Sequence, residues 1–273
     1  MRGAVAMERT AGDPRPMMQT SLSGVMAASR DLGVVSNNLA NAMSVGFKRS
    51  TSQFLTTQGF EASAVRVSET QGPLKATQSA LDFAIEGTGH FVFKDPNALP
   101  GVDASLVYSR AAQLKISPDG SLVDSAGRQL MGLPTPNSTT PIELNLQKIP
   151  GIDISKISSI TVDSSGALNI LSTNGVTTKA GTLAIARFPS EDGLRAQGGS
   201  SFIETDRSGA PLFTRPGANG AGLLKQGMLE QANVDITVEL LRMIQLQQSY
   251  NANSRALQTT SEIYRSTTET IAR

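Results

Sequence analysis

The sequence predicts an α+β protein in which long N- and C-terminal coiled-coil-type helices flank a central all-β domain built of short antiparallel hairpins. Three observations support this fold class. An apolar stripe with helical spacing lies near the start of the chain, and a long segment without Gly or Pro lies near its end. Between them, short apolar runs are separated by turn-forming Gly, Pro, Asn and Asp residues.

The composition is typical of a folded protein with few charged residues and a net charge close to zero. Of 273 residues, 39% are hydrophobic, 4% are aromatic and 17% are charged, with a formal net charge of +1. This balance gives no electrostatic reason to expect nucleic acid as a partner. Because cysteine is absent, disulfides, thiolate zinc sites and a cysteine nucleophile are excluded. No apolar run has the length of a membrane span, and residues 1–20 lack the apolar stretch of a secretory signal.

Changes in composition along the chain divide it into five parts. We expect a disordered leader at 1–17, with Met17 or Met18 as an alternative first residue, because this segment has no periodicity. The other parts are an N-terminal core helix at 18–42, an extended linker at 43–80, a central β domain at 81–230 and a C-terminal core helix at 231–273. Residues 134–180 are a possible insertion in the β domain, since the Pro-rich stretch from Leu133 to Pro150 is typical of a boundary or loop.

The first helix is predicted from apolar residues at steps of three and four positions, which form one helical stripe. The stripe ends at Asn41, a residue that tolerates the left-handed conformation that often closes a helix, and Gly46 follows in a turn. The stripe consists of Leu22, Val25, Ala28, Leu32, Val35 and Leu39.

The central domain is predicted from its turns. Pro118-Asp119-Gly120, Ser165-Gly166 and Asn174-Gly175 are typical of turns that join antiparallel strands. The single histidine, His90, is interpreted as a solvent-facing strand residue, because no cysteine or second histidine exists to complete a catalytic or metal-binding group. Gly87-Thr88-Gly89 lacks the third Gly and the following helix of a dinucleotide loop. We therefore predict no catalytic or metal-binding residues and no cofactor.

The last helix is predicted from a heptad repeat. Its first row consists of Ile236, Met243, Tyr250, Leu257, Tyr264 and Ile271. A second row becomes polar along its length and consists of Leu240, Gln247, Ser254, Ser261 and Thr268. Asn233 and Asp235 are expected to cap the helix start. A helix about 55 Å long implies burial against other chains, and its polar second row predicts a helix that is weak alone and orders on assembly. A simple intramolecular hairpin of the two terminal helices is the alternative.

Several motifs resemble those of bacterial flagellar rod and hook proteins. Residues 36–41, followed by Gly46-Phe47-Lys48-Arg49, resemble the signature at the end of the first helix of that family, with Ser44 where Thr is usual. Residues 81–91 look like its central motif, with His90 where an aromatic residue is common. Residues 226–235 and 243–254 resemble its C-terminal signature. Together the matching segments cover most of the chain outside the leader and residues 134–180.

The resemblance implies a structural subunit of the flagellar basal-body rod, the hollow drive shaft that transmits torque from motor to hook, rather than an enzyme. The implied partners are other copies of the chain, neighbouring rod and hook axial proteins, and the flagellar type III export apparatus. The implied location is the basal body, spanning the periplasm and reached without a cleaved secretory signal. Residues 72–77 favour the proximal rod.

Four alternatives remain open. Within the family they are a distal rod subunit and a hook-type subunit. A subunit of another helical sheath, such as a phage tail or a needle, shares the helix pattern but not the signature of residues 36–49. A secreted β-domain binding module or enzyme is the alternative from a different class.

The residues expected to carry assembly come from both terminal regions and from the signature motifs. They are Leu22, Val25, Leu32, Val35, Asn37, Asn38, Leu39, Asn41, Gly46, Phe47, Asn233, Asp235, Leu240, Met243, Tyr250, Leu257, Tyr264 and Ile271.

Overall fold

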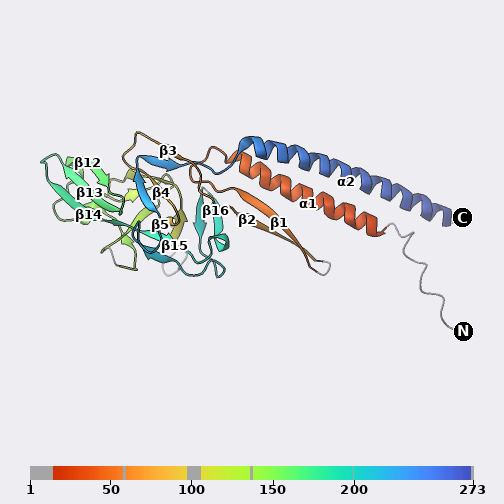
Figure 1. Cartoon of the computed structure of the whole chain (residues 1–273), viewed down its shortest axis with the longest axis horizontal. Helices are drawn as coiled ribbons and strands as arrows, with labels where there is room; N and C mark the ends of the chain where they lie inside the picture. The colour runs from red at the N-terminus through yellow and green to blue at the C-terminus, as the bar shows by residue number, and fades with distance from the viewer. Residues whose placement is uncertain (1–14, 58–59, 97–105, 136–137, 199, 272–273) are drawn as a thin grey trace, which may run out of the picture. The chain divides into compact units, whose positions relative to one another are not determined.

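The computed structural model describes residues 15–57, 60–96, 106–135, 138–198 and 200–271 (Figure 1). The chain forms two compact units. One consists of the terminal segments 1–40 and 235–273 with residues 50–66, and the other of residues 41–49 and 67–234. A central region of antiparallel strands and a helix from each end confirm the predicted α+β class. Of the predicted leader, residues 1–14 lie outside the described residues, and the rest belongs to the first helix.

The first unit contains both long helices, α1 (Arg15–Ala40) and α2 (Ile236–Ile271), which lie side by side in Figure 1. Helix α2 starts where Asp235 caps it, because the carboxylate Oδ1 accepts hydrogen bonds from the backbone N–H groups of Thr237 at 2.8 Å and Val238 at 3.2 Å. This capping role of Asp235 was predicted. The unit also contains a two-stranded antiparallel hairpin, β1 (Ser50–Thr57) and β2 (Phe60–Val67).

The hairpin lies where the sequence indicated only an extended linker that passes into a strand. Its two strands have weak polar–apolar alternation, and no Asn-Gly or Asp-Gly pair marks their turn. The sequence therefore carried neither of the two local signals by which a hairpin is recognised.

The second unit is built almost entirely of short strands. In the described residues its largest sheet has the main order β12-β13-β14-β10-β5-β6-β17-β16, and β8, β9, β11, β15 and β18 pair at its sides. Smaller sheets have the orders β19-β4-β7 and β20-β3. The strands are β3 (Leu74–Ala76), β4 (Asp82–Glu86), β5 (His90–Lys94), β6 (Leu106–Ser109), β7 (Ala112–Gln113), β8 (Lys115–Ile116), β9 (Leu122–Val123), β10 (Gln129–Leu133), β11 (Ile142–Glu143), β12 (Ile157–Val162), β13 (Ala167–Ser172), β14 (Thr177–Leu183), β15 (Ile185–Arg187), β16 (Arg195–Gly198), β17 (Ser201–Ile203), β18 (Leu212–Thr214), β19 (Leu223–Gln226) and β20 (Met228–Glu230). Short 3₁₀ helices lie at η2 (Leu146–Lys148), η3 (Ile154–Lys156) and η4 (Glu191–Gly193).

The predicted turns are present, and each is closed by a glycine in the left-handed region. The backbone φ angle is +80° at Gly120, +81° at Gly166 and +77° at Gly175. The last two glycines join β12 to β13 and β13 to β14, which pair in antiparallel register. These turns fix the strand order of the region that the sequence indicated as a possible insertion.

Residues 134–180 are in fact part of the main sheet and of its core. Strand β14 pairs with β10, with Gly132 opposite Leu183. Leu168 and Ile170 on β13 belong to the same buried cluster as Phe91. The segment is therefore integrated with the strands that flank it in sequence.

Strand β5 is buried on both faces, because it separates two hydrophobic clusters. Phe91 and Phe93 belong to the cluster that also contains Leu168, whereas Val92 belongs to the second cluster with Tyr108 and Phe188. Side chains alternate between the faces of a strand, so this division follows from the strand geometry. It also places His90, two residues before Val92, on the side of the second cluster.

Candidate assembly helices and the buried charge cluster

The two long helices pair antiparallel along a partly polar seam. The seam is defined here as Gly24, Ala28, Asp31, Val35 and Asn38 on α1 with Glu239, Leu246, Asn253 and Thr260 on α2. At one end Asn38 contacts Glu239, and near the other a Cβ atom on Gly24 would lie 2.8 Å from the amide nitrogen of Asn253. Ala28 and Val35 are buried between these contacts.

The second row of α2 residues that packs against α1 lies one position earlier than the sequence indicated. Core positions of a helix pair alternate steps of three and four. In the row three residues after Ile236, Glu239 and Thr260 are buried, and Leu246 and Asn253 are half-buried. The row four residues after Ile236 begins with Leu240, which is exposed. The sequence did not indicate the earlier row as the buried one, because that row begins with the charged residue Glu239.

The apolar residues predicted for assembly lie mostly outside the seam. Leu22, Leu240, Tyr250 and Tyr264 are exposed, Val25, Leu32, Leu39, Met243 and Leu257 are half-buried, and Val35 is buried. Among the polar residues of the same set, Asn37 is exposed, Asn41 is half-buried and Asn38 is buried. The backbone of Ile271 ends α2, but its side chain lies outside the described residues.

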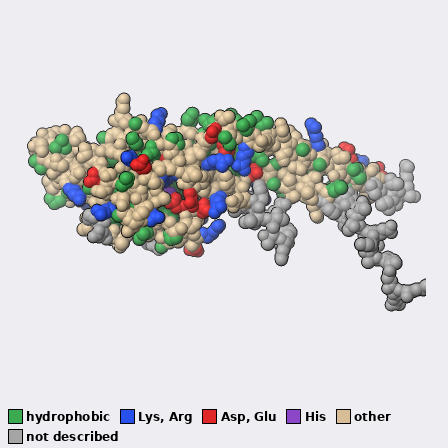
Figure 2. Space-filling view, viewed as in Figure 1, with side chains coloured by type: hydrophobic (Ala, Val, Ile, Leu, Met, Phe, Trp, Pro, Cys, Tyr) green, Lys and Arg blue, Asp and Glu red, His purple; other side chains and the backbone are tan. Residues whose placement is uncertain are grey.

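Further apolar side chains are exposed on the first two turns of α2. Ile236, Val238, Leu241 and Ile244 join Leu240 there, and Leu241 is 58% exposed. Figure 2 shows such hydrophobic side chains on the surface of the helices. Within the first unit, no packing of the described residues covers them.

Asn38 connects three elements of the first unit. Its amide nitrogen donates to the Ser50 carbonyl oxygen at 2.8 Å and to Glu239 Oε2 at 3.4 Å, and its oxygen accepts the Ser50 N–H at 2.9 Å. The side chain thus pairs with the backbone at the start of β1 as a neighbouring strand would. Asn38 and Glu239 are both 0% exposed.

Gly46, the glycine of the first signature, lies where two backbone segments of the second unit approach each other closely. This approach leaves no room for a side chain. Gly46 has a φ angle of +66° and donates its N–H to the Glu230 carbonyl oxygen at 2.7 Å. A Cβ atom at this position would lie 2.7 Å from the backbone nitrogen of Ala111. Phe47, the next predicted residue, is half-buried and accepts the Asn233 N–H on its carbonyl oxygen.

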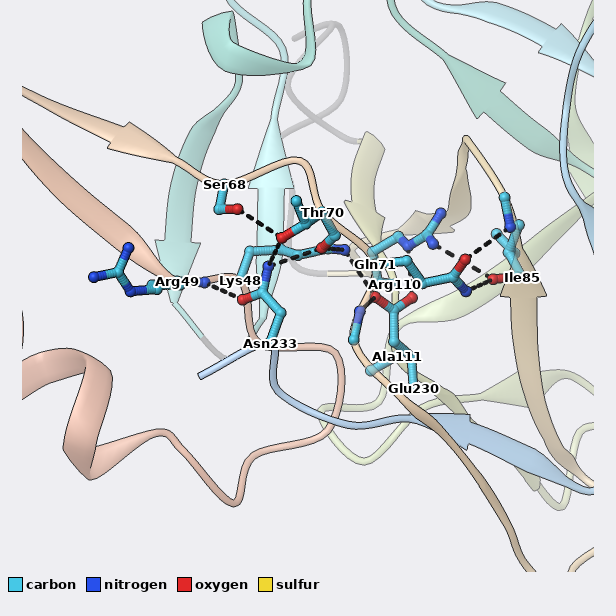
Figure 3. Close-up of polar contacts among 12 residues, drawn as sticks. Lys48, Arg49, Ser68, Thr70, Gln71, Ile85, Arg110, Ala111, Glu230 and Asn233 are labelled. Carbon is cyan, nitrogen blue, oxygen red and sulfur yellow. Dashed lines mark hydrogen bonds and ion pairs between the residues drawn. The ribbon is translucent and has the colours of Figure 1, made fainter. Parts of the chain in front are cut away.

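A buried charge cluster, defined as Lys48, Arg110 and Glu230, ties three distant segments of the second unit together (Figure 3). Lys48 Nζ lies 2.7 Å from Glu230 Oε1, and Arg110 Nε lies 2.8 Å from Glu230 Oε2. The Gly72 N–H also donates to Glu230 Oε1 at 3.0 Å. Burial lowers the pKa of Lys48, and the Glu230 charge partly opposes that shift. Sequence reasoning missed this cluster, because nothing local links residues so far apart.

Asn233 does not cap α2, contrary to the prediction. Its Oδ1 accepts the Arg49 N–H at 2.6 Å, and its Nδ2 donates to the Thr70 carbonyl oxygen at 2.8 Å (Figure 3). The helix starts three residues later, so the Asn233 side chain lies too early to reach its first N–H groups. Asn233 instead joins the first signature to the segment before β3.

His90 is buried, so its interpretation as a solvent-facing residue is wrong. Its ring lies at the edges of Phe188 and Phe202, with centroid distances of 6.1 and 5.8 Å. Burial is the first cause that lowers its pKa to about 3, followed by the positive charges of Arg110 and Lys48. His90 thus occupies an aromatic position in the core as a neutral ring.

The described residues contain neither a candidate metal site nor a candidate membrane-spanning helix. No group of three or more His, Asp or Glu side chains there is placed to hold a metal ion. None of the helices in that part of the chain is both long and apolar enough to cross a membrane.

The fold and these contacts define a class of structural protein, with terminal helices that pair through a polar seam and expose apolar side chains, and a separate β-rich unit. Three family profiles match the chain. They are described as "Flagella basal body rod protein" at residues 18–48, "Flagellar hook protein FlgE/F/G D1 domain" at 84–170 and "Flagellar basal body rod FlgEFG protein C-terminal" at 225–270. The three matched ranges fall in the two units described above.

Relatives extend the similarity over most of the chain. The flagellar basal-body rod protein FlgG of Buchnera aphidicola subsp. Acyrthosiphon pisum is 30% identical, covering 91% of this chain and 96% of the relative. The FlgG protein of Agrobacterium fabrum is 31% identical, covering 88% and 94%. The chain belongs to the flagellar basal-body rod protein family, whose members are structural proteins. The predicted family and the predicted non-enzymatic role are therefore confirmed.

Proposed function

We propose that this chain assembles through its terminal helices into the hollow flagellar rod that transmits torque from motor to hook. The observation that carries this proposal is the row of exposed apolar side chains on α2. Ile236, Leu240 and Ile244 recur at four-residue intervals on its surface, and Val238 and Leu241 lie beside them. An apolar helix face without a cover is an interaction surface, and the occupant that this proposal assigns to it is the helix pair of a second copy.

The same proposal assigns the partners and the location. Neighbouring rod and hook axial proteins continue the helical stack, and the flagellar type III export apparatus delivers the chain without a cleaved secretory signal. The rod then spans the periplasm within the basal body. Within the rod, the motif at residues 72–77 favours a proximal position, and a distal position stays the alternative.

Two charge substitutions on the exposed row test assembly directly. The double variant L241E/I244E changes side chains that lie outside the seam, so the second unit and the helix pair should keep their structure. We expect it to abolish rod formation and motility in a strain that lacks its own copy. The control Q245E/Q248E adds the same charge to the same exposed stretch of α2 and should retain assembly. Normal assembly of L241E/I244E would contradict the proposal.

Limited proteolysis tests whether the helices order on assembly. Arg242 is half-buried and Arg255 and Arg265 are exposed, so trypsin should cut at all three in the free subunit if α2 is weak alone. The assembled protein should resist cleavage at the same bonds. If the free subunit is already resistant, the helices do not depend on assembly for their order.

Removal of residues 234–273 separates this function from a secreted binding module or enzyme. The truncated chain keeps all of the second unit except its last residue, Val234. A rod subunit should lose assembly, whereas a self-contained β-domain binder or enzyme should retain its activity.

A further inference from the structure

The seam of the helix pair carries polar residues at heptad spacing. Gly24, Asp31 and Asn38 follow one another at intervals of seven on α1, and Asp31 and Asn38 are polar. The α2 row that faces them begins with Glu239, whose carboxylate is fully buried. A helix pair that needed only stability would place apolar residues at such positions.

Asn38 supplies a hydrogen bond to this buried carboxylate. Burial of an ionised group without hydrogen bonds is strongly unfavourable. Asn38 Nδ2 donates to Glu239 Oε2 at 3.4 Å, and the two remaining bonds of the Asn38 amide go to the backbone of Ser50. The two hydrogen bonds to Ser50 on β1 therefore fix the orientation of the Asn38 amide that faces Glu239.

A slip of α2 by one heptad along α1 removes this arrangement. In one direction, Leu246 takes the place of Asn253 opposite Gly24, and Glu239 then faces Asp31, a second carboxylate. Burial already raises the pKa of Asp31, and the Arg242 charge lowers it in the native pairing. In the slipped pairing, two acidic groups would share one low-dielectric position, and Asn38 would have no partner on α2.

We propose that Asn38 and Glu239 are positioning residues that lock the α1–α2 pair in a single register. The lock determines which exposed side chains of the two helices lie next to one another, and so it defines the surface that the pair presents. This inference concerns the helix pair within one chain. It does not depend on the proposed rod function, and its test does not require assembly, because a disulfide traps the helix pair even if the pair forms only part of the time.

The absence of native cysteine allows each register to be trapped by a disulfide. The pair G24C/N253C reports the native register, because a Cβ atom on Gly24 already falls within contact distance of the Asn253 side chain. The pair G24C/L246C reports the slipped register. Each pair is introduced into the full-length chain and equilibrated in a glutathione buffer, and the fraction of crosslinked chain is measured by peptide mapping.

With Asn38 and Glu239 in place, the fraction of chain crosslinked in the native register should exceed the fraction crosslinked in the slipped register by about tenfold or more. The ratio of these two fractions is the quantity that the variants should change. In the apolar background N38L/E239L this ratio should fall towards one, while helix content by circular dichroism is unchanged or higher. The control N37L alters the exposed neighbour of Asn38 and should leave the ratio unchanged.

The conservative variant E239Q provides a second test that stays valid if N38L/E239L fails to form the helix pair. The Gln side chain keeps a hydrogen bond to Asn38 but cannot repel Asp31, so the ratio should fall while the native register stays favoured. The proposal is overturned if the ratio is near one in the unsubstituted background. It is equally overturned if the ratio stays the same in both N38L/E239L and E239Q.

Discussion

Burial of His90 gives the second unit a sensitivity to acid that a single substitution should remove. The side chain is 3% exposed, and its Nδ1 atom has no hydrogen-bond partner among the described residues. Burial and the charges of Arg110 and Lys48 lower the His90 pKa from 6.5 to about 3. The folded state therefore keeps the imidazole neutral at pH values at which the unfolded chain protonates it.

The sign and size of the effect follow from proton linkage. Between pH 6.5 and pH 3 the unfolded chain binds the additional proton, so the free energy of unfolding decreases as the pH falls. The contribution of neutral His90 to the free energy of unfolding is fully present above pH 6.5 and is lost progressively towards pH 3. From pH 7 to pH 4 the loss is about 3 kcal/mol, since one pKa unit corresponds to about 1.4 kcal/mol. The variant H90F keeps an aromatic ring and cannot titrate, so it should lack this part of the pH dependence.

Urea denaturation of the full chain at pH 7 and pH 4 measures the difference. Of the three tyrosines, Tyr108 is buried in the second unit, and the background Y250F/Y264F makes its fluorescence specific for that unit. The variant H90Q serves as a second non-titrating control. It should share the smaller pH dependence of H90F even if its stability at pH 7 is lower. An equal loss of stability between pH 7 and pH 4 in the parent and in both variants would refute the reasoning.

Three further predictions follow from single contacts, each measured by chemical or thermal denaturation. E230Q leaves Lys48 and Arg110 buried without their shared counter-charge and should cost about 3–5 kcal/mol, whereas E86Q, which removes an exposed partner of Lys225, should cost less than about 0.5 kcal/mol. G46A forces a side chain into a left-handed position against backbone and should destabilise the second unit by more than about 1 kcal/mol. G33A meets no atom within 4 Å and should stabilise α1 by about 0.5–1 kcal/mol, while G24A, with the same gain in helix propensity, should be worse because it collides with Asn253. Equal effects of G33A and G24A on the thermal transition of the helices would show that the pairing is not as described.

The features that the sequence predicted correctly are those with local causes. Gly120, Gly166 and Gly175 each follow residues that favour a turn, and each adopts the positive φ angle that the turn needs. Asp235 caps α2 because its side chain acts on N–H groups only two and three residues away. Both long helices follow from apolar spacing within single segments.

The features that it did not predict depend on residues far apart in the sequence. Glu230 is an ordinary acidic residue until the fold brings Lys48 and Arg110 to it. His90 is interpreted as solvent-facing if only its chemistry is considered, but β5 has a core cluster on each side, so His90 and the three residues after it are all buried. The seam of α2 was misplaced for the same reason, since only the partner helix shows that the buried row begins with Glu239.

The distribution of side chains over α1 and α2 differs from that in a self-contained helix hairpin, because polar residues share the seam with Ala28 and Val35. Such a hairpin buries its apolar residues in the seam and exposes its polar ones. Here Asp31, Asn38 and Glu239 lie in the seam, whereas Leu241 and Ile244 lie outside it. This arrangement is favourable if the pair is one member of a larger bundle, because the outer face of each pair then becomes part of the interior. It follows that apolar replacements in the seam should yield a more stable free chain without improving the subunit, whereas polar replacements on the outer face should leave the free chain intact and remove its ability to assemble.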